Sequence, residues 1–444
     1  MSHFVQSLEA RRLFAGDIAV HQSDGVVRLI ASEGATVDLR VERVDSRSVR
    51  LIGEGVTIDG AASKRVRLGS SRLVMDFTRA ANVRTMLAGL QMKRGVTWSA
   101  SNGSLSLQDS TVGALSASDR ASKDATLVLL SDSTITGDAN IQLDTGDNDL
   151  TLTNTTVGGN LMLRDRGGHN SVSLGNSEVK GNASLATGKL RDRFTVENSR
   201  FRKTFALSAG GANDTILLDR SDFAGKLAIN DGDGRDAIQT RLAYDFNEGK
   251  LGWSAGFADY ATNELEDPIS TWGTLPTGLD GNGWTLGATN RADDTVMYLT
   301  RPVGQREGVV AGLDHVLDYN VRFASNAPSG GIGAGGAPGE AVRMKVGGSA
   351  EPLTTSDEKH RLNLDVGDQG NSGLDATTAG NIANGRSPDD PELYVDLDRQ
   401  AVHAYTVRSD EAGTVHLFVG TDSGYEGRTV LAYRSVDVTL RAVR

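Results

Sequence analysis

The side chains whose spacing best suits chemistry form a column of amides and carboxylates in the middle of the chain. Asn148, Asn170, Asp192, Asp214 and Asp236 follow one another at intervals of 22 residues. If each interval is one coil of a stack, the three aspartates lie about 4.8 Å apart and repel one another by about 1 kcal/mol per neighbouring pair in water. A bound cation relieves that repulsion, so Asp192, Asp214 and Asp236 are candidate calcium ligands.

A metal-free explanation of the same column stays open. The words "GGAND" and "GDGRD" around it resemble half of the calcium-binding GGxGxDxUx repeat, but that repeat has period nine and the period here is 22. Arg193 and Arg235 stand beside the acids and can neutralise them. Asn and Asp side chains also bond to the backbone of their own turns, which needs no cation.

A second acidic group lies in the expected loops of the C-terminal half. Asp293 and Asp294 are adjacent, and Asp422 and Glu426 lie more than 120 residues further along the chain. Jelly-roll domains commonly bind a structural calcium through oxygen ligands of this kind. We therefore predict these four as ligands of a jelly-roll calcium, with solvated loop charges as the alternative.

Aromatic residues in the same half suggest a surface for sugar rings. Trp272 and Trp284 flank the glycine-rich stretch 278–283, and we expect both to be exposed. Asn326, at the start of the glycine-rich stretch "SNAPSGGIGAGGAPGE", is the third candidate ligand-binding residue. Aromatic rings stack on the apolar faces of sugars, although burial between two sheets is the alternative fate of a tryptophan.

No set of residues predicts catalysis. The chain has no cysteine, and neither a Ser-His-Asp nor a paired-carboxylate pattern can be assigned. The expected outward positions of the repeats, such as Thr151, Ser173 and Thr195, are small and uncharged. The rival hypothesis is a polysaccharide-degrading lyase or hydrolase with its site on the irregular coils 18–125 or between the domains.

The elements that position these residues are read from a repeat of 22 residues. Apolar columns recur at this period, among them Ile135, Val157, Val179, Phe201 and Phe223. Pairs of apolar residues two apart are typical of strands, and no helical spacing appears. The period predicts a parallel β-helix of 22-residue coils, regular over 126–240 and irregular over 18–125, and the chain resembles right-handed parallel β-helix repeat proteins.

Two polar columns accompany the apolar ones, and one of them consists of Asp132, Asn154, Asn176 and Asn198. Ser133, Thr155, Ser177, Ser199 and Ser221 are expected to form a ladder of hydroxyl groups along the stack. A further column of glycines is expected at a turn that needs left-handed backbone angles. It consists of Gly137, Gly159, Gly181 and Gly225.

Beyond residue 240 the period stops, and we predict a separate domain over 244–444. Seven or more alternating runs with Gly/Asn/Asp loops favour an antiparallel β-sandwich of jelly-roll type. The opening "YDFNEGKLGW" and the closing "SVDVTL" resemble carbohydrate-binding jelly rolls, and the region resembles a bacterial secreted domain of unknown function. The predicted fold class is all-β: a parallel β-helix followed by a jelly-roll sandwich.

Composition and the N-terminus bear on partners and location. The formal charge of −11 argues against a nucleic-acid partner, and no apolar run is long enough for membrane insertion. "SLEARRLFAGD", within the N-terminal segment 1–17, resembles the LEPR-XLL element of planctomycete extracellular proteins, with Ala10 in place of proline and Phe14 in place of leucine. The resemblance implies an extracellular or cell-surface protein. The leading hypothesis is a non-catalytic β-helix stalk whose jelly-roll module binds a polysaccharide or another cell-surface component, with an assembly role as a further alternative.

Overall fold

The computed structural model describes residues 16–119, 124–291, 293–356 and 359–443. The N-terminal LEPR-XLL-like stretch therefore lies almost entirely outside the described residues. The chain forms two compact units. The solenoid unit runs to Ile216 and includes Ser221–Asp236, and the sandwich unit consists of Leu217–Arg220 and the chain from Ala237 onward.

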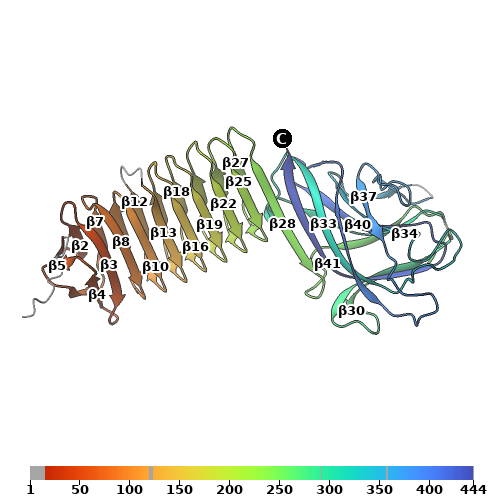
Figure 1. Cartoon of the computed structure of the whole chain (residues 1–444), viewed down its shortest axis with the longest axis horizontal. Helices are drawn as coiled ribbons and strands as arrows, with labels where there is room; N and C mark the ends of the chain where they lie inside the picture. The colour runs from red at the N-terminus through yellow and green to blue at the C-terminus, as the bar shows by residue number, and fades with distance from the viewer. Residues whose placement is uncertain (1–15, 120–123, 292, 357–358, 444) are drawn as a thin grey trace, which may run out of the picture. The chain divides into compact units, whose positions relative to one another are not determined.

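The solenoid unit is a stack of coils whose strands pair in parallel (Figure 1). Three sheets run along the stack. The first contains β27 (Leu227–Asn230), β24 (Phe205–Ser208), β21 (Ala183–Ala186), β18 (Leu161–Arg164), β15 (Ala139–Gln142), β12 (Leu115–Asp119), β9 (Val96–Ala100), β7 (Arg72–Phe77), β2 (Val26–Ala31), β1 (Asp17–Ser23) and β5 (Thr57–Ile58). The second contains β25 (Thr215–Asp219), β22 (Arg193–Glu197), β19 (Ser171–Gly175), β16 (Asp149–Thr153), β13 (Thr126–Ser131), β10 (Gly103–Gln108), β8 (Asn82–Ala88), β3 (Thr36–Arg43), β4 (Ser48–Gly53) and β6 (Ser63–Arg67). The third contains β11 (Thr111–Val112), β14 (Thr134–Ile135), β17 (Thr156–Val157), β20 (Glu178–Val179), β23 (Arg200–Phe201) and β26 (Asp222–Phe223).

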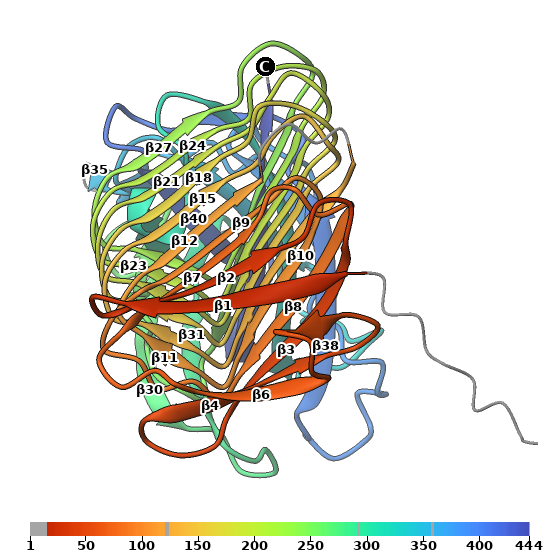
Figure 2. The ribbon, with the colours of Figure 1, turned by 90° about the vertical axis from the view of Figure 1, so that its left-hand side faces the viewer.

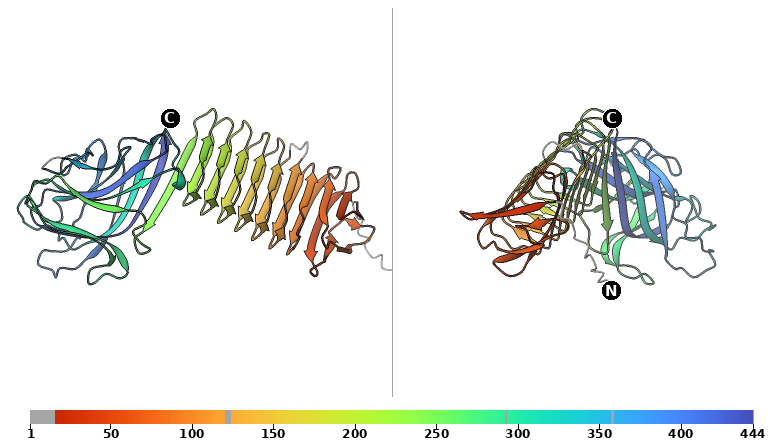
Figure 3. Two further views of the ribbon diagram at one scale, coloured as in Figure 1. Left: turned by 180° about the vertical axis from the view of Figure 1, so that it is seen from behind. Right: turned by 60° about the vertical axis from the view of Figure 1, so that its left-hand side comes forward.

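The predicted period is confirmed by the register of the sheets. Leu150 pairs with Val172 and Leu152 with Leu174 across β16 and β19, so each residue lies beside the one 22 positions further along. The apolar columns fill the interior, where the Phe201 and Phe223 rings stack with centroids 5.3 Å apart. Figure 3 shows the same coils from behind.

The first coils are irregular because antiparallel strands interrupt the stack. β1 pairs antiparallel with β2, and β4 pairs antiparallel with both β3 and β6. Figure 2 shows these strands crossing the end of the solenoid. They cover the core of the first coil, which a parallel stack alone leaves open.

The ladder of hydroxyl groups is present, and its hydrogen bonds connect successive coils. The backbone N–H of Thr155 donates to Ser177 Oγ, that of Ser177 to Ser199 Oγ, and that of Ser199 to Ser221 Oγ, each at 3.1 Å. Each side chain thus satisfies a turn N–H of the preceding coil.

The glycine column is needed for a different reason from the one expected. The left-handed angles belong to the polar column before the serines, where Asn154, Asn176 and Asn198 have φ of 48° to 49°. Gly181 instead leaves room for the neighbouring coil, because a Cβ there would lie 2.4 Å from Gly159 O. The expectation of left-handed glycines was therefore wrong, since asparagine tolerates that region and close stacking requires glycine.

The sandwich unit packs two antiparallel sheets face to face, which confirms the predicted class. The first sandwich sheet contains β30 (Leu265–Thr274), β31 (Asn282–Asn290), β28 (Ala237–Asp245), β41 (Arg428–Val443), β33 (Asp314–Ser325), β38 (Val395–Val402) and β39 (Val407–Arg408). The second contains β29 (Ser254–Ala258), β32 (Thr295–Val303), β40 (Val415–Ser423), β34 (Val342–Ser349) and β37 (Ala376–Asn381). Three short elements complete the unit: η1 (Gln305–Glu307), β35 (Thr355–Ser356) and β36 (Arg361–Leu362).

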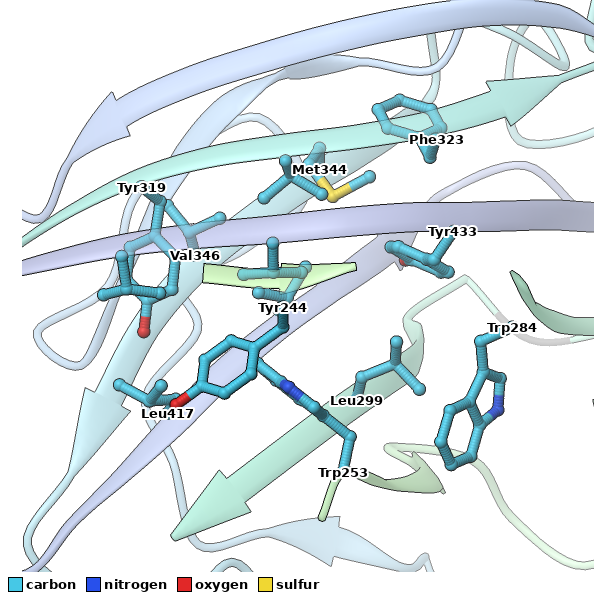
Figure 4. Packing of buried hydrophobic residues seen from close by; sticks show 14 of the residues in the cluster. Tyr244, Trp253, Trp284, Leu299, Tyr319, Phe323, Met344, Val346, Leu417 and Tyr433 are labelled. Atoms are coloured by element: carbon cyan, nitrogen blue, oxygen red, sulfur yellow. The ribbon is translucent and has the colours of Figure 1, made fainter. Parts of the chain in front are cut away.

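The core of the sandwich lies between the two sheets and is rich in aromatic rings (Figure 4). Tyr244 and Trp253 meet edge to face with centroids 5.5 Å apart, and Tyr319, Phe323 and Tyr433 are buried nearby. A smaller apolar cluster lies on the outer face of the second sheet, where Leu364 and Val366 pack on Tyr298 and Phe418. The segment 360–367 therefore covers a sheet, and only Arg361–Leu362 within it form a strand, β36.

Candidate functional site

The predicted column of amides and carboxylates forms one continuous ladder in the solenoid. The N–H of Asn148 donates to Asn170 Oδ1 at 3.0 Å, that of Asn170 to Asp192 Oδ1 at 2.8 Å, and that of Asp192 to Asp214 Oδ1 at 2.7 Å. The N–H of Asp214 continues the series to Asp236 Oδ1 at 2.7 Å. The ladder explains why the positions accept only residues with a side-chain carbonyl or carboxylate oxygen at this length, and calcium at the three aspartates stays a prediction.

Three of the four predicted jelly-roll calcium ligands lie together. Asp422 is fully buried on β40, and Lys345 Nζ lies 3.4 Å from its Oδ2. Burial and the nearby Asp422 and Asp368 carboxylates raise the pKa of Asp294 to about 6, although the side chain is partly exposed, and Asp293 adds to that effect. Glu426 is exposed, and its backbone N–H donates to Ala334 O at 3.0 Å.

Lys345 already supplies a positive charge at this acidic group. Its Nζ donates to Val366 O at 2.9 Å and to Asn371 O at 2.6 Å, so one buried ammonium group ties the covering segment to the sheet. Among the described residues, no group of three His, Asp or Glu side chains has an arrangement suited to a metal ion. A calcium at Asp293, Asp294, Asp422 and Glu426 stays a prediction.

The two predicted tryptophans differ in their exposure. Trp284 is 3% exposed and belongs to the sandwich core, so the expectation that it is exposed was wrong. Its strand, β31, lies inside the sheet between β30 and β41, and its ring faces the second sheet. Trp272 lies opposite it on the edge strand β30, is 36% exposed and donates Nε1–H to Phe246 O at 2.8 Å. Asn326 is half-buried directly after β33.

A depression in the solenoid unit is lined by charged side chains, but its carboxylates accept hydrogen bonds that stabilise the turns. It has a volume of about 690 Å³ and includes Asp119, Asp144 and Asp165. Asp165 Oδ1 accepts the Gly167 N–H and its Oδ2 accepts Asn148 Nδ2, while Asp119 accepts the Thr126 hydroxyl. These bonds fix the turns of successive coils, and they occupy both oxygens of Asp165.

A polar site of the sandwich lies on the outer face of its first sheet. Alternation along β28, β33 and β41 turns the apolar residues into the core and the polar ones outward. The outward side chains surround an open depression of about 600 Å³. Its lining includes four carboxylates, two guanidinium groups and two amides, from Asp245, Asp280, Asp396, Asp437, Arg322, Arg434, Asn247 and Asn282.

The guanidinium groups are held in place by acids and by the backbone. Arg434 donates from Nε to Asp396 Oδ1, and from Nη1 to Asp280 O at 3.0 Å. Arg322 Nε lies 3.3 Å from Asp398 Oδ1. The Asn247 side chain is fixed as well, because its Oδ1 accepts the Asn282 N–H at 2.9 Å.

The depression carries an excess of negative charge. Four carboxylates against two guanidinium groups leave two negative charges in excess among the lining side chains. Partial burial raises the pKa of Asp437, Arg322 and Arg220 oppose the rise, and Asp245 adds to it. A ligand therefore meets fixed hydrogen-bonding groups of both signs in a field that favours neutral or positively charged molecules.

An aromatic ring lies on the same face. Tyr394, two residues before Asp396, is half-buried and packs on Ala324 and Ala432, which point outward from β33 and β41. Burial raises the pKa of its hydroxyl group. The face thus offers the apolar body of a tyrosine beside charged and amide groups, a combination suited to a sugar ring.

Few features of the sequence indicate this site. Its residues come from five separate segments, and of the eight charged and amide side chains only Asp245, Asn247 and Asp437 fall within the segments noted above, "YDFNEGKLGW" and "SVDVTL". One available signal is the alternation in "VDLDRQAV" (395–402), where Asp396, Asp398 and Gln400 mark an exposed strand face.

Comparison with known proteins gives distant structural likenesses. No family model and no curated protein matches the chain. The chain is similar to a carbohydrate-binding module of the β-sandwich superfamily described as promiscuous in specificity, with 11% identity and a TM-score of 0.23, over 43% of this chain and 58% of that one. It is also similar to a mannan-recognising carbohydrate-binding module, with 12% identity and a TM-score of 0.23, over 47% and 99%. A third likeness is to the K1 cleaved adhesin domain of Lys-gingipain from Porphyromonas gingivalis, with 12% identity and a TM-score of 0.23, over 45% and 97%. The function proposed below rests on this chain's own residues.

Proposed function

We propose that the sandwich unit binds a glycan on the outer face of its first sheet, and that the protein acts as a non-catalytic glycan-binding protein. The observation that supports this most directly is the depression of about 600 Å³ lined by preorganised carboxylate, guanidinium and amide groups. Such planar groups form paired hydrogen bonds with neighbouring hydroxyls, and fixing them in advance lowers the entropy cost of binding.

The proposal also includes where the protein acts and what the solenoid does. The protein is exported or held at a cell surface, where polysaccharides are found, and the solenoid acts as a stalk for the binding module. In the described part of the chain, no helix has the length and apolar character needed to cross a membrane.

The test is binding of the full chain to a panel of soluble polysaccharides, with two matched arginine variants. Arg434→Ala removes a guanidinium group from the depression, and Arg408→Ala removes an exposed one that pairs only at the surface with Asp314. We expect Arg434→Ala to weaken binding by about tenfold to a hundredfold, since a charged hydrogen bond contributes about 1.5–3 kcal/mol.

Arg408→Ala is expected to bind like the wild type. A thermal unfolding curve for each variant separates lost binding from lost folding. The proposal is wrong if the wild type binds none of the polysaccharides, or if Arg434→Ala binds them unchanged.

A further inference from the structure

A lysine and an aspartate meet on the covered outer face of the second sandwich sheet. Lys345 of β34 and Asp422 of β40 are both fully buried, and Lys345 Nζ lies 3.4 Å from Asp422 Oδ2. The two strands are neighbours, and the direct cross-strand partner of Lys345 is Gly420, which has no side chain to separate the two groups. The register thus places an amine beside a carboxyl group as diagonal neighbours on one face of the sheet.

The surroundings of this pair keep water away from it. Leu364 and Val366 of the covering segment pack on Phe418, which lies on the same face of β40 as Asp422. Lys345 Nζ donates to Val366 O at 2.9 Å and to Asn371 O at 2.6 Å, so the covering segment is fastened directly over the amine. Two opposite charges in such a place have lost their hydration, and a reaction that removes both charges also removes that penalty.

Two further groups contact the Asp422 carboxyl group. The backbone N–H of Gln369 donates to it, and the Asp294 carboxyl group lies within hydrogen-bonding reach of it. A backbone N–H in this position stabilises the oxygen that gains negative charge when an amine attacks a carboxyl carbon. The site therefore holds a nucleophile, an acyl carbon and a donor for the developing oxyanion, which are the parts of an acyl-transfer reaction.

We propose that Lys345 and Asp422 condense to an isopeptide bond in the folded sandwich, so that the chain covalently links β34 to β40. Lys345 Nζ attacks Asp422 Cγ, the Nζ–Cγ bond forms, and the bond from Cγ to one carboxyl oxygen breaks. Starting from ammonium and carboxylate, two of the three Nζ protons pass to the departing oxygen, directly or through the Asp294 carboxyl group, and that oxygen leaves as water. The third proton stays on the amide nitrogen. No atom is oxidised or reduced, so the reaction needs no added reagent.

Fixed geometry and burial favour the bond over the separate groups. Well-oriented groups within one molecule react as if at about 10⁵–10⁸ M, because folding has already restricted their motion. The product replaces two buried charges by a neutral amide. Its single N–H keeps one of the two present acceptors, Val366 O or Asn371 O, so the reaction loses one hydrogen bond of the amine.

The mass of the intact full-length chain tests for the bond. The wild type should be lighter than its sequence mass by one water, and the difference should persist after complete denaturation. A tryptic digest should contain a branched peptide that joins the segments around Lys345 and Asp422, and its fragment ions should locate the link. A wild type that has its full sequence mass overturns the proposal.

Two conservative variants assign the mass loss to these residues. A carboxamide condenses with an amine by releasing ammonia, so Asp422→Asn should lose one ammonia and reach the same final mass as the wild type. Lys345→Arg keeps the positive charge but offers no amine, so it should keep its full mass. Circular dichroism shows whether each variant folds, and the branched peptide of the wild type decides the question if one does not.

Three results would count against the assignment. One is a loss of water that persists in Lys345→Arg, because dehydration at another residue then explains the mass. Another is a folded Asp422→Asn that keeps its full mass. The third is a wild type of full mass whose thermal unfolding shifts upward with added calcium, since Asp422 is then a free carboxylate that binds the cation.

Discussion

At the scale of single residues, the two tryptophans on neighbouring strands show how one step across a sheet changes a side chain's role. Trp284 and Trp272 are direct cross-strand partners, yet one is buried in the core and the other is an edge residue with more than a third of its surface exposed. Lys250 Nζ lies 5.4 Å from the Trp284 ring centroid. Sequence spacing treats both as loop-flanking aromatics, and only the pairing of β31 with β41 reveals the difference.

Replacing each tryptophan should distinguish the core residue from the edge residue by the loss of unfolding free energy. Trp284→Ala is expected to lower the free energy of unfolding of the sandwich by about 3–5 kcal/mol, because it removes a large buried side chain and leaves a cavity. Trp272→Ala loses mainly partial contact and one hydrogen bond, and should cost about 1–2 kcal/mol. Urea denaturation followed by tryptophan fluorescence measures both, and equal losses would contradict the assignment of Trp284 to the core.

At the scale of elements, each solenoid coil combines three kinds of position that the sequence shows to different degrees. The apolar columns are visible at once, since Leu, Ile, Val and Phe occupy most of their positions in 135–223. The polar columns are also visible, but their roles depend on backbone angles that spacing does not reveal. Gly181 illustrates this, because the left-handed angle expected at the glycine column belongs to Asn176, and it is close stacking that requires the glycine.

Substitutions at Asn176 test whether the left-handed backbone angle selects asparagine in this column. Asn176 is exposed and has φ of 49°, so its backbone conformation rather than its packing decides what it tolerates. Asn176→Ala should lower the free energy of unfolding by about 1–2 kcal/mol, whereas Asn176→Gly should leave it within about 0.5 kcal/mol. Chemical denaturation of the two variants side by side gives the comparison. If alanine is tolerated as well as glycine, the left-handed angle is not what selects asparagine here.

The fold class of the sandwich could be predicted from the sequence, but the polar depression on its first sheet could not. Alternating runs identify strands such as β33, because a strand with one buried face alternates apolar and polar residues in the sequence. The depression on the first sheet depends on which strands become neighbours. Arg434 of β41 meets Asp396 of β38 across β33, although 38 residues separate them, and no local pattern encodes that meeting.

At the scale of the whole molecule, charge is the property that bears on ligand choice. The chain has a formal net charge of −11, and the depression has two negative charges in excess. A polyuronate approaching it is repelled both at long range and at the site, whereas a neutral or amino-substituted glycan is not.

Selectivity among polysaccharides should follow this charge. We expect chitosan oligosaccharides and neutral glycans to bind more tightly than polygalacturonate or alginate of similar length. Added salt should weaken binding of the amino glycan and strengthen any residual binding of the polyuronate, because it screens attraction and repulsion alike. Affinity electrophoresis or calorimetry at low and high salt measures these trends, and tight binding of polyuronate at low salt would contradict the charge argument.

The identical register of successive coils has a consequence for how such a chain changes length during evolution. Since the paired strand residues in 149–223 lie beside their counterparts 22 positions away, removing or duplicating one whole period rejoins matching surfaces, and the ladders close again without a gap. Any other number of residues leaves core residues facing solvent. The solenoid can thus change length in steps of about 4.8 Å per coil, and insertions of a whole period lengthen it without changes to its core.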